Sequence, residues 1–138
     1  MRVFTEKENL YPTPKEVIEK MIVCMGKGVS GCTTILEPSA GKGDLADGLR
    51  KAFYHEPQID CVELDAELAH TLRGKGYPTV QTDFLTYYPD KKYGFIVLNP
   101  PFDKGASHLL HAMELQRDGG RIICLLNAET LKNPYSKE

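Results

Sequence analysis

Two kinds of apolar pattern alternate along this chain. Residues 15–25 (KEVIEKMIVCM) carry apolar side chains at helical spacing, and Thr13 and Pro14 before them suit a helix cap and a first turn. Three further stretches have the polar and apolar faces of helices: residues 43–55, 66–76 and 106–120. Five short runs rich in Ile, Val and Leu are typical of strands: residues 33–38, 59–65, 79–84, 93–100 and 121–127. This alternation, with residues 85–92 as a loop, predicts an open, mainly parallel α/β sheet with helices on both faces.

Length and composition place the chain among ordinary globular proteins. Its 138 residues suit a single domain, residues 1–138, and 41% hydrophobic with 26% charged residues is typical of a water-soluble fold. No apolar run approaches the roughly 20 residues of a membrane-spanning helix, and the first 16 residues lack the apolar core of a signal peptide. We therefore expect a cytoplasmic protein with no membrane partner. The four cysteines form no CxxC pair, and Cys61 and Cys124 lie in apolar runs, which predicts buried free thiols.

Ligands of open parallel sheets bind outside the carboxyl ends of the strands, so the strand ends are the place to look for a site. The first predicted strand runs into LEPSAGKGDLA, where Gly41 and Gly43 permit a tight turn and close approach of a ligand to the backbone. The second ends at Glu63, a carboxylate about 20 residues beyond the glycines, where dinucleotide folds hold a ribose diol. The third ends at Asp83 and Phe84, which offer a hydrogen-bond acceptor and a flat face.

The glycine-rich segment alone leaves more than one ligand open. Gly41, Gly43 and Ala46 fit the G-x-G-x-x-A fingerprint, so an enzyme that binds a nicotinamide or flavin dinucleotide stays an alternative. Glu37, before the glycines, disfavours it, because its charge would repel a pyrophosphate and attract the ammonium group of an amino acid. The segment therefore favours a ligand with a cationic amino acid end.

The fourth predicted strand ends in the stretch VLNPPF. Pro100 and Pro101 lack N–H donors and cannot continue a buried strand, so the strand stops at Asn99. Because proline φ is fixed at about −65°, we expect the Asn99 amide and the Pro100 carbonyl to be held as two acceptors beside the Phe102 ring. We call residues 99–102 the NPPF ledge. A group with two N–H donors and a flat face would fit it.

The motifs LEPSAGKGDLA, CVELD, TDF and VLNPPF, in that order, resemble those of class I S-adenosylmethionine-dependent methyltransferases of the amino-methylating type. The segment YPTP before the first helix is similar to the one that precedes the cofactor loop in N6-adenine DNA methyltransferases. The resemblance covers residues 11–127 and implies a Rossmann-like fold, S-adenosyl-L-methionine as cofactor and methyl transfer to an exocyclic amino nitrogen. It assigns cofactor binding to Tyr11, Thr13, Glu37, Pro38, Ser39, Ala40, Gly41, Gly43, Glu63, Leu64, Asp83 and Phe84, and catalysis to Asn99, Pro100, Pro101 and Phe102.

The resemblance implies a role for each group around the cofactor. Glu37 and the backbone of residues 41–43 would hold the methionine part, with Thr13 reaching its carboxylate. Glu63 would hold the ribose hydroxyls, and Asp83 with the ring after it would bind the adenine. The implied site contains no metal ligands.

In the NPPF ledge, the resemblance makes Asn99 and Pro100 acceptors for both hydrogens of the target amine, with Phe102 stacked on the target ring. An aromatic amine attacks poorly because its lone pair is delocalised into the ring. Two acceptors draw the nitrogen toward tetrahedral geometry and stabilise the positive charge that develops on it. In-line positioning against a sulfonium leaving group supplies much of the rest, so no cysteine nucleophile or histidine base is required.

The resemblance favours DNA over RNA as the nucleic acid substrate, with N6 of adenine as the target. A base amine in ribosomal RNA or a glutamine side chain in a protein stay alternatives, because those methyltransferases use similar N-P-P motifs; a cofactor-binding subunit without catalysis is another. The net charge of −2 lacks the basic field of a protein that binds nucleic acid alone, and neither the family's C-terminal strand pair nor a target-recognition region is evident. We therefore expect an incomplete catalytic core that is complemented by a separate target-recognition region or subunit.

His108 and His111 lie one helical turn apart, as in a metal-binding pair. No third ligand accompanies them, so the interpretation is a solvated helix face, and no metal-ligating residue is assigned.

Overall fold

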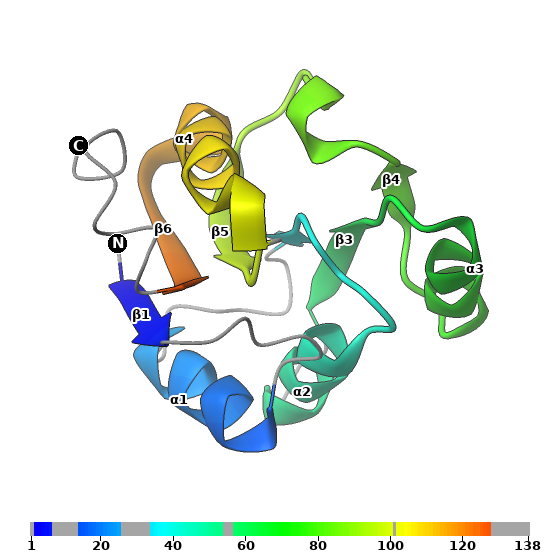
Figure 1. Cartoon of the computed structure of the whole chain (residues 1–138), viewed down its shortest axis with the longest axis horizontal. Helices are drawn as coiled ribbons and strands as arrows, with labels where there is room; N and C mark the ends of the chain where they lie inside the picture. Colours follow the sequence, from blue (N-terminus) through cyan, green and yellow to red (C-terminus); the bar gives the residue numbers. More distant parts are fainter. Residues whose placement is uncertain (1, 7–13, 26–33, 54–56, 101, 128–138) are drawn as a thin grey trace.

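The computed structural model describes residues 2–6, 14–25, 34–53, 57–100 and 102–127 of the chain. In these ranges six strands form one sheet, all parallel, in the spatial order β1-β6-β5-β2-β3-β4 (Figure 1). The strands are β1 (Arg2–Glu6), β2 (Thr34–Glu37), β3 (Gln58–Val62), β4 (Thr79–Gln81), β5 (Tyr93–Leu98) and β6 (Gln116–Asn127). Because all of them run in the same direction, their carboxyl ends meet at one edge of the sheet.

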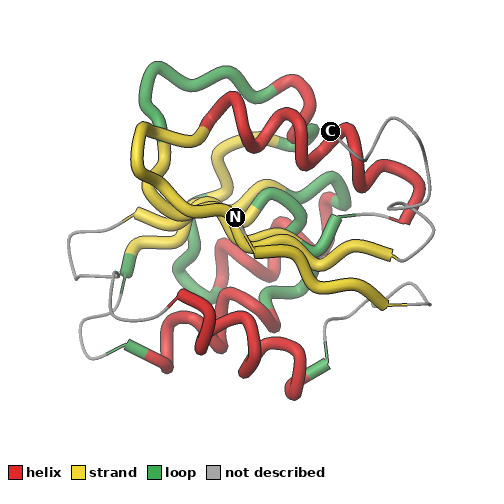
Figure 2. Tube along the Cα trace, turned by 90° about the vertical axis from the view of Figure 1, so that its left-hand side faces the viewer, coloured by secondary structure: helices red, strands yellow, loops and turns green. Residues whose placement is uncertain are grey.

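Helices cover both faces of this sheet (Figure 2). They are α1 (Lys15–Met25), α2 (Asp44–Ala52), α3 (Ala66–Gly74) and α4 (Gly105–Leu115), with the short 3-10 turns η2 (Phe84–Thr86) and η3 (Phe102–Lys104). Residues of α1, α2 and α3 belong to an apolar cluster on one face, and residues of α4 to a cluster on the other. None of the helices in the described ranges is long and apolar enough to cross a membrane.

The central strands are buried on both faces because their side chains alternate between the two clusters. Ile35 on β2 and Val97 on β5 lie in the cluster with α1, α2 and α3, whereas their neighbours Leu36 and Leu98 lie in the cluster with α4. All four side chains are fully buried. Near-continuous apolar runs are therefore required in these strands, as is usual for a parallel sheet covered on both sides.

The main features of the fold agree with the sequence prediction. The five predicted strands are β2 to β6, and numbered in chain order they lie in the order 3-2-1-4-5, so the Rossmann-like α/β class is confirmed. Cys61 and Cys124 are buried free thiols, as predicted. Strand β1 has no predicted counterpart: its five residues contain only two apolar side chains, and the parallel pairing of Val3 with Cys124 on β6 makes them a strand.

Helix α4 is shorter than the sequence pattern predicts. It ends at Leu115, and β6 begins at Gln116, whereas the prediction extends the helix to a glycine cap at residues 119–120. Gly119 has a φ of 75°, and a Cβ at Gly120 would lie 2.9 Å from the backbone oxygen of Arg117. The two glycines therefore serve the irregular start of a strand, where the chain passes close to itself.

Candidate active site

Three polar residues follow neighbouring strands at the carboxyl edge of the sheet. Glu37 is the last residue of β2, Glu63 comes directly after β3, and Asn99 comes directly after β5. Strand β2 pairs with both β3 and β5, so these residues lie on adjacent strands at the centre of the sheet. The structure thus brings the two predicted cofactor-binding carboxylates together with the start of the NPPF ledge.

The segment between β2 and α2, residues 38–43, is named the glycine loop. Gly41 has a φ of 59° and Gly43 a φ of 100°, a backbone region that glycine adopts without strain. The Ala40 N–H donates to the Val62 carbonyl on β3, and the Gly43 N–H donates to the Ala40 carbonyl, each at 3.0 Å. Gly43 caps α2, and no side chain of the described residues forms a cap hydrogen bond there, so this helix start suits an anionic ligand group.

The carboxyl group of Glu37 is buried beside the glycine loop, and its residue is 1% exposed. Its Oε1 accepts a 3.3 Å hydrogen bond from the Ser39 N–H, whereas its Oε2 has no partner among the described residues. Burial raises the pKa of Glu37 to about 8; the Ser39 hydrogen bond opposes this rise, and the charge of Glu63 adds to it to a smaller degree. A cationic group placed at Oε2 would satisfy this acceptor and favour the ionised carboxylate.

Glu63 is bonded to the glycine loop and to the start of α3. Its Oε1 accepts a 2.6 Å hydrogen bond from the Gly41 N–H, and its Oε2 accepts one of 2.8 Å from the Asp65 N–H. A carboxylate has about four lone-pair sites, so each oxygen keeps capacity for a further donor. The neighbouring Leu64 side chain is 66% exposed, which offers an apolar surface beside this carboxylate.

Asp83 and Phe84 follow β4 but face different environments. Asp83 is exposed, and its Oδ1 accepts a 3.0 Å hydrogen bond from the Leu85 N–H that caps η2. Phe84 is 2% exposed and lies in the cluster with α4. Its ring centroid is 5.3 Å from that of His108 and 4.7 Å from that of His111. Phe84 therefore supports the turn that carries Asp83, and its contact with a ligand stays a prediction.

The two histidines of α4 are not on a solvated face, and that interpretation is wrong. Both are 6% exposed, because they pack on Phe84. Nδ1 of His108 lies 3.4 Å from the hydroxyl of Ser39 in the glycine loop, and Nε2 of His111 lies 2.8 Å from the Tyr87 carbonyl. Burial and nearby Lys104 lower the pKa of His108 to about 4. In the described part of the chain, no three or more metal-ligating side chains are grouped.

Comparison with known proteins gives partial matches. No family model matches the chain. The type II methyltransferase M.CvrRI of Paramecium bursaria Chlorella virus XZ-6E is 35% identical over 91 residues, which are 65% of this chain and 23% of that protein. The solved 23S rRNA methyltransferase ErmE has a TM-score of 0.64 at 21% identity, over 87% of this chain and 49% of that one. TrmN from Thermus thermophilus has a TM-score of 0.63 at 18% identity, over 86% and 39%.

A third solved structure, an S-adenosylmethionine-dependent methyltransferase from Clostridium acetobutylicum, has a TM-score of 0.58 at 16% identity, over 82% of this chain and 50% of that one. The chain has the class I S-adenosylmethionine-dependent methyltransferase fold. It spans 23% of M.CvrRI and half or less of these three structures. The methyltransferase fold is therefore matched to a part of each protein.

Some predicted site residues of this methyltransferase fold are placed only in part. Tyr11, Thr13 and Pro101 lie outside the described residues. Phe102 begins η3, but the position of its ring is not among the described features. In the ledge, Asn99 is 7% exposed and Pro100 is buried. In the glycine loop, Pro38 and Ala40 are buried and Ser39 is half-buried.

Two residues beside the site were not predicted from the sequence. His108 contacts Ser39, and the Lys75 ammonium donates to the Lys42 carbonyl in the glycine loop. The sequence did contain a signal that His108 is buried, because residues 108, 111, 112 and 115 have the spacing of one buried helix face. No local sequence pattern indicates the contact between Lys75 and Lys42, since the two residues are 33 positions apart.

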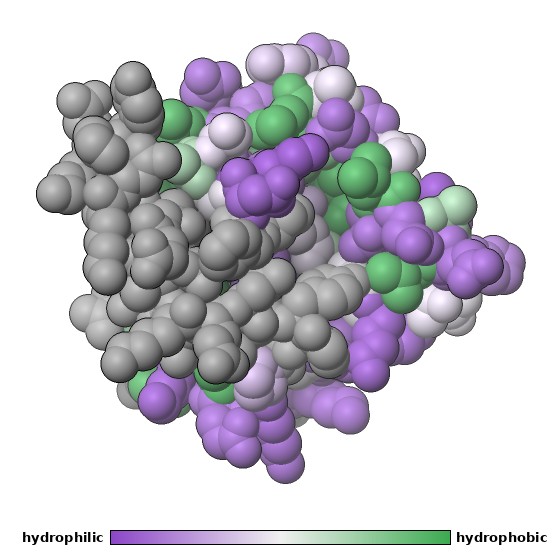
Figure 3. Space-filling view, viewed as in Figure 1, coloured by the Kyte–Doolittle hydropathy of each residue, from purple (hydrophilic) through white to green (hydrophobic). Residues whose placement is uncertain are grey.

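The surface of the methyltransferase fold gives no single large apolar area in the view of Figure 3. Where this face is described, hydrophilic side chains predominate and apolar ones occur in small groups. The exposed large apolar side chains in the described ranges are distributed over several elements: Val23, Leu64, Val80, Tyr88, Leu110 and Met113. Scattered side chains of this kind are usual on a monomeric domain.

Proposed function

We propose that this chain is the cofactor-binding core of an enzyme that uses S-adenosyl-L-methionine to methylate an exocyclic amino nitrogen, with N6 of adenine in DNA as the favoured target. The observation that carries the proposal is the buried Oε2 of Glu37, which has no partner among the described residues and lies beside the glycine loop. A buried polar atom without a hydrogen-bond partner is costly. The ammonium group of the methionine part would supply that partner.

The other groups at this edge of the sheet suit the rest of the same molecule. The first N–H groups of α2 and the backbone of residues 41–43 would hold the methionine carboxylate. Glu63 has acceptor capacity for ribose hydroxyls, and exposed Asp83 has it for the adenine amino group. The cofactor supplies a methyl group on a sulfonium, which is a good leaving group.

The NPPF ledge would bind the group that receives the methyl. The Asn99 side-chain oxygen and the Pro100 carbonyl are proposed to accept hydrogen bonds from the target amine, directly after the strand next to Glu37. Preorganised acceptors of this kind stabilise positive charge on the nitrogen, an effect of about 3 kcal/mol per well-placed group. Phe102 is proposed to stack on the target ring.

The choice of DNA rests on the NPPF ledge and on the 91-residue match to M.CvrRI, whose name describes a type II methyltransferase. The net charge of −2 gives no basic field over the chain as a whole. Strong binding to a nucleic acid usually depends on neutralising several phosphates. We therefore propose that a separate region or subunit supplies most of the contact with DNA.

Two measurements test the proposal. Calorimetry should show binding of S-adenosylmethionine or S-adenosylhomocysteine and no binding of NAD; the reverse result overturns the cofactor assignment. Transfer of tritiated methyl groups to separate DNA, RNA and protein pools, followed by identification of the modified nucleoside or residue, tests the substrate. Label on an RNA base or on glutamine would replace DNA by that substrate, and cofactor binding without transfer to any pool would support a non-catalytic subunit.

A further inference from the structure

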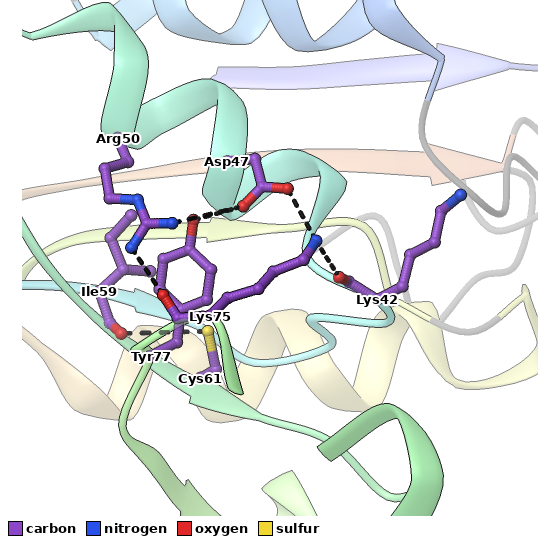
Figure 4. A network of polar contacts seen from close by, with 7 residues as sticks. All are labelled: Lys42, Asp47, Arg50, Ile59, Cys61, Lys75 and Tyr77. Atoms are coloured by element: carbon purple, nitrogen blue, oxygen red, sulfur yellow. Dashed lines mark hydrogen bonds and ion pairs between the residues drawn. The ribbon is translucent and has the colours of Figure 1, made fainter. Parts of the chain in front are cut away.

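Lys75 lies directly after α3 and belongs to a polar network that reaches the glycine loop (Figure 4). Its Nζ donates to the backbone carbonyl of Lys42 at 2.8 Å and to Oδ2 of Asp47 on α2 at 2.8 Å. The Lys75 side chain is about one-third exposed, so these contacts are only partly screened by water. One ammonium group therefore connects the end of α3, the glycine loop and the first turns of α2.

The bonded carbonyl lies between the two glycines of the loop. Lys42 stands between Gly41 and Gly43, both of which have positive φ. Glycine loses more conformational freedom on ordering than other residues, so a loop of this kind needs fixed contacts to hold one conformation. The approach is close: a Cβ at Gly43 would lie 3.4 Å from Nζ of Lys75.

The rest of the network holds the lysine in place. The other oxygen of Asp47 accepts a 2.6 Å hydrogen bond from the hydroxyl of Tyr77, and the Arg50 guanidinium lies 4.3 Å over the Tyr77 ring. Arg50 also donates to the backbone carbonyl of Lys75 at 2.9 Å. Burial alone would raise the pKa of Asp47, but the hydrogen bonds from Lys75 and Tyr77 bring it below its usual value. Asp47 is therefore ionised at neutral pH and remains a partner for Lys75.

The loop is thus held from two sides. Glu63 accepts from the Gly41 N–H on the side of β3, and Lys75 donates to the Lys42 carbonyl on the side of α3. We propose that Lys75 is a positioning residue, which fixes the glycine loop in the conformation that binds the methionine part of the cofactor; this rests on the proposed function. Lys75 does not touch the ligand in this proposal and acts through the loop backbone.

The test compares two variants of the same network. Lys75→Met removes the donor to the loop, whereas Tyr77→Phe removes a different hydrogen bond to Asp47 and leaves the loop contact in place. By calorimetry we expect Lys75→Met to weaken S-adenosylhomocysteine binding by about tenfold, since a charge-assisted hydrogen bond is lost. Tyr77→Phe should bind within about twofold of the wild type, because an unaltered loop needs no reordering. Lys75→Leu, which also lacks a donor, serves as the second variant if Lys75→Met does not fold.

Amide hydrogen exchange of residues 41–43 without ligand gives a readout that does not depend on cofactor binding. Faster exchange in the Lys75 variant than in Tyr77→Phe supports the proposal, because only the first loses a contact to the loop. Equal losses of affinity in the two variants, or unchanged affinity and exchange in the Lys75 variant, overturn it. If the wild type binds neither methionine-derived ligand, the proposed function fails, and the exchange result still decides whether Lys75 orders the loop.

Discussion

The carboxylate of Glu63, directly after β3, accepts a 2.6 Å hydrogen bond from the N–H of Gly41, which lies 22 residues earlier in the glycine loop. Its second oxygen accepts from the Asp65 N–H at 2.8 Å. The side chain that is proposed to hold the ribose is therefore already fixed in place by the loop that is proposed to hold the methionine part. Fixed geometry of this kind lowers the conformational entropy that the protein loses when it binds a ligand.

Glu63→Ala is expected to weaken S-adenosylhomocysteine binding by about 1–3 kcal/mol, because charge-assisted hydrogen bonds to the ribose are lost. The loss of the Gly41 contact adds to this effect by releasing the loop. Calorimetry gives the dissociation constant, and Glu67→Ala, at an exposed position in the first turn of α3, is the control. A dissociation constant that is the same in Glu63→Ala and in the wild type would remove Glu63 from the site.

Cofactor binding is expected to release a proton from Glu37. Burial raises the pKa of this carboxyl to about 8, so it is protonated in the free protein at pH 7. A bound ammonium group favours the ionised form, and affinity should therefore rise by up to about tenfold per pH unit as the pH approaches 8 from below. Calorimetry at pH 7 in buffers with different ionisation enthalpies measures the released proton. Equal binding enthalpies in all buffers would contradict the prediction.

The same carboxyl should reduce the stability of the free protein as the pH rises. Between its usual pKa of 4.5 and about 8, Glu37 keeps its proton in the folded state and loses it in the unfolded state. Its stabilising effect is therefore complete below pH 4.5 and is lost as the pH rises through about 8. Thermal denaturation should show Glu37→Gln close to the wild type at pH 4 and more stable at pH 8. Glu67→Gln, at an exposed position, is the control.

The order of elements was predictable from the sequence, because apolar runs bounded by polar residues mark β2, β3, β5 and β6, although β4 (Thr79–Gln81) has only one apolar residue. The end of α4 was not predictable from the sequence, since glycines such as Gly119 and Gly120 are common both at helix ends and at irregular strand starts. Only the pairing of β6 with β5 distinguishes these cases. In the same way, the short β1 is defined by its partner β6 and not by its own residues.

The candidate site was predictable where a residue stands at a strand end. Glu37, Glu63 and Asn99 meet this condition, so parallel strands bring them to one edge whatever the details of packing. The contacts of His108 with Ser39 and of Lys75 with the glycine loop depend on how α4 and α3 pack on the sheet. These contacts connect residues 69 and 33 positions apart, so the local sequence does not name either partner. The spacing of the buried α4 residues indicates only that His108 lies on a buried helix face.

Gly48 on α2 is expected to be required for the packing of α2 against α1 (Figure 1). A Cβ at this position would lie 2.6 Å from Cγ2 of Ile18 on α1. Gly48→Ala gains about 1 kcal/mol of helix propensity but overpacks the contact by about 1–3 kcal/mol, so we expect a net loss of stability. Gly74→Ala is the matched control, because nothing lies within 4 Å of its Cβ position, and it should stabilise the fold by about 0.4–1 kcal/mol. Urea denaturation measures the stability of both variants. Equal denaturation midpoints for Gly48→Ala and Gly74→Ala would contradict the packing argument.

His108 is expected to stay neutral throughout the physiological range. Burial and the charge of Lys104 lower its pKa to about 4, although Asp83 and Asp103 act in the opposite direction. Because the folded pKa is depressed, the stabilising effect of the neutral ring is present above pH 6.5 and is lost as the pH falls toward 4. NMR titration of the ring nitrogens measures this, with exposed His70 in the same spectra for comparison. A titration midpoint of His108 near 6.5 would contradict its burial beside Phe84.

Asn99→Ala separates the role of the NPPF ledge in the reaction from cofactor binding. If the Asn99 oxygen polarises the target amine, the variant should keep its affinity for S-adenosylhomocysteine and lose methyl transfer by a factor on the order of 10² or more. Transfer is measured in an active form of the protein, with the proposed target-recognition region or subunit present. Ser107→Ala, at an exposed position on α4, is the control for turnover.

Phe102→Ala should instead weaken binding of the proposed target base more than binding of the cofactor. A base in a DNA duplex would have to leave its stack to reach the ledge, and the variant would offer it no ring to stack on. Since Asn99 is 7% exposed, thermal denaturation of both ledge variants must show that they remain folded at the assay temperature. Folded Asn99→Ala with normal turnover would mean that the amide oxygen takes no part in the transition state. The two prolines would then serve only to end β5, and the acceptor for the target amine would have to be sought on another strand end.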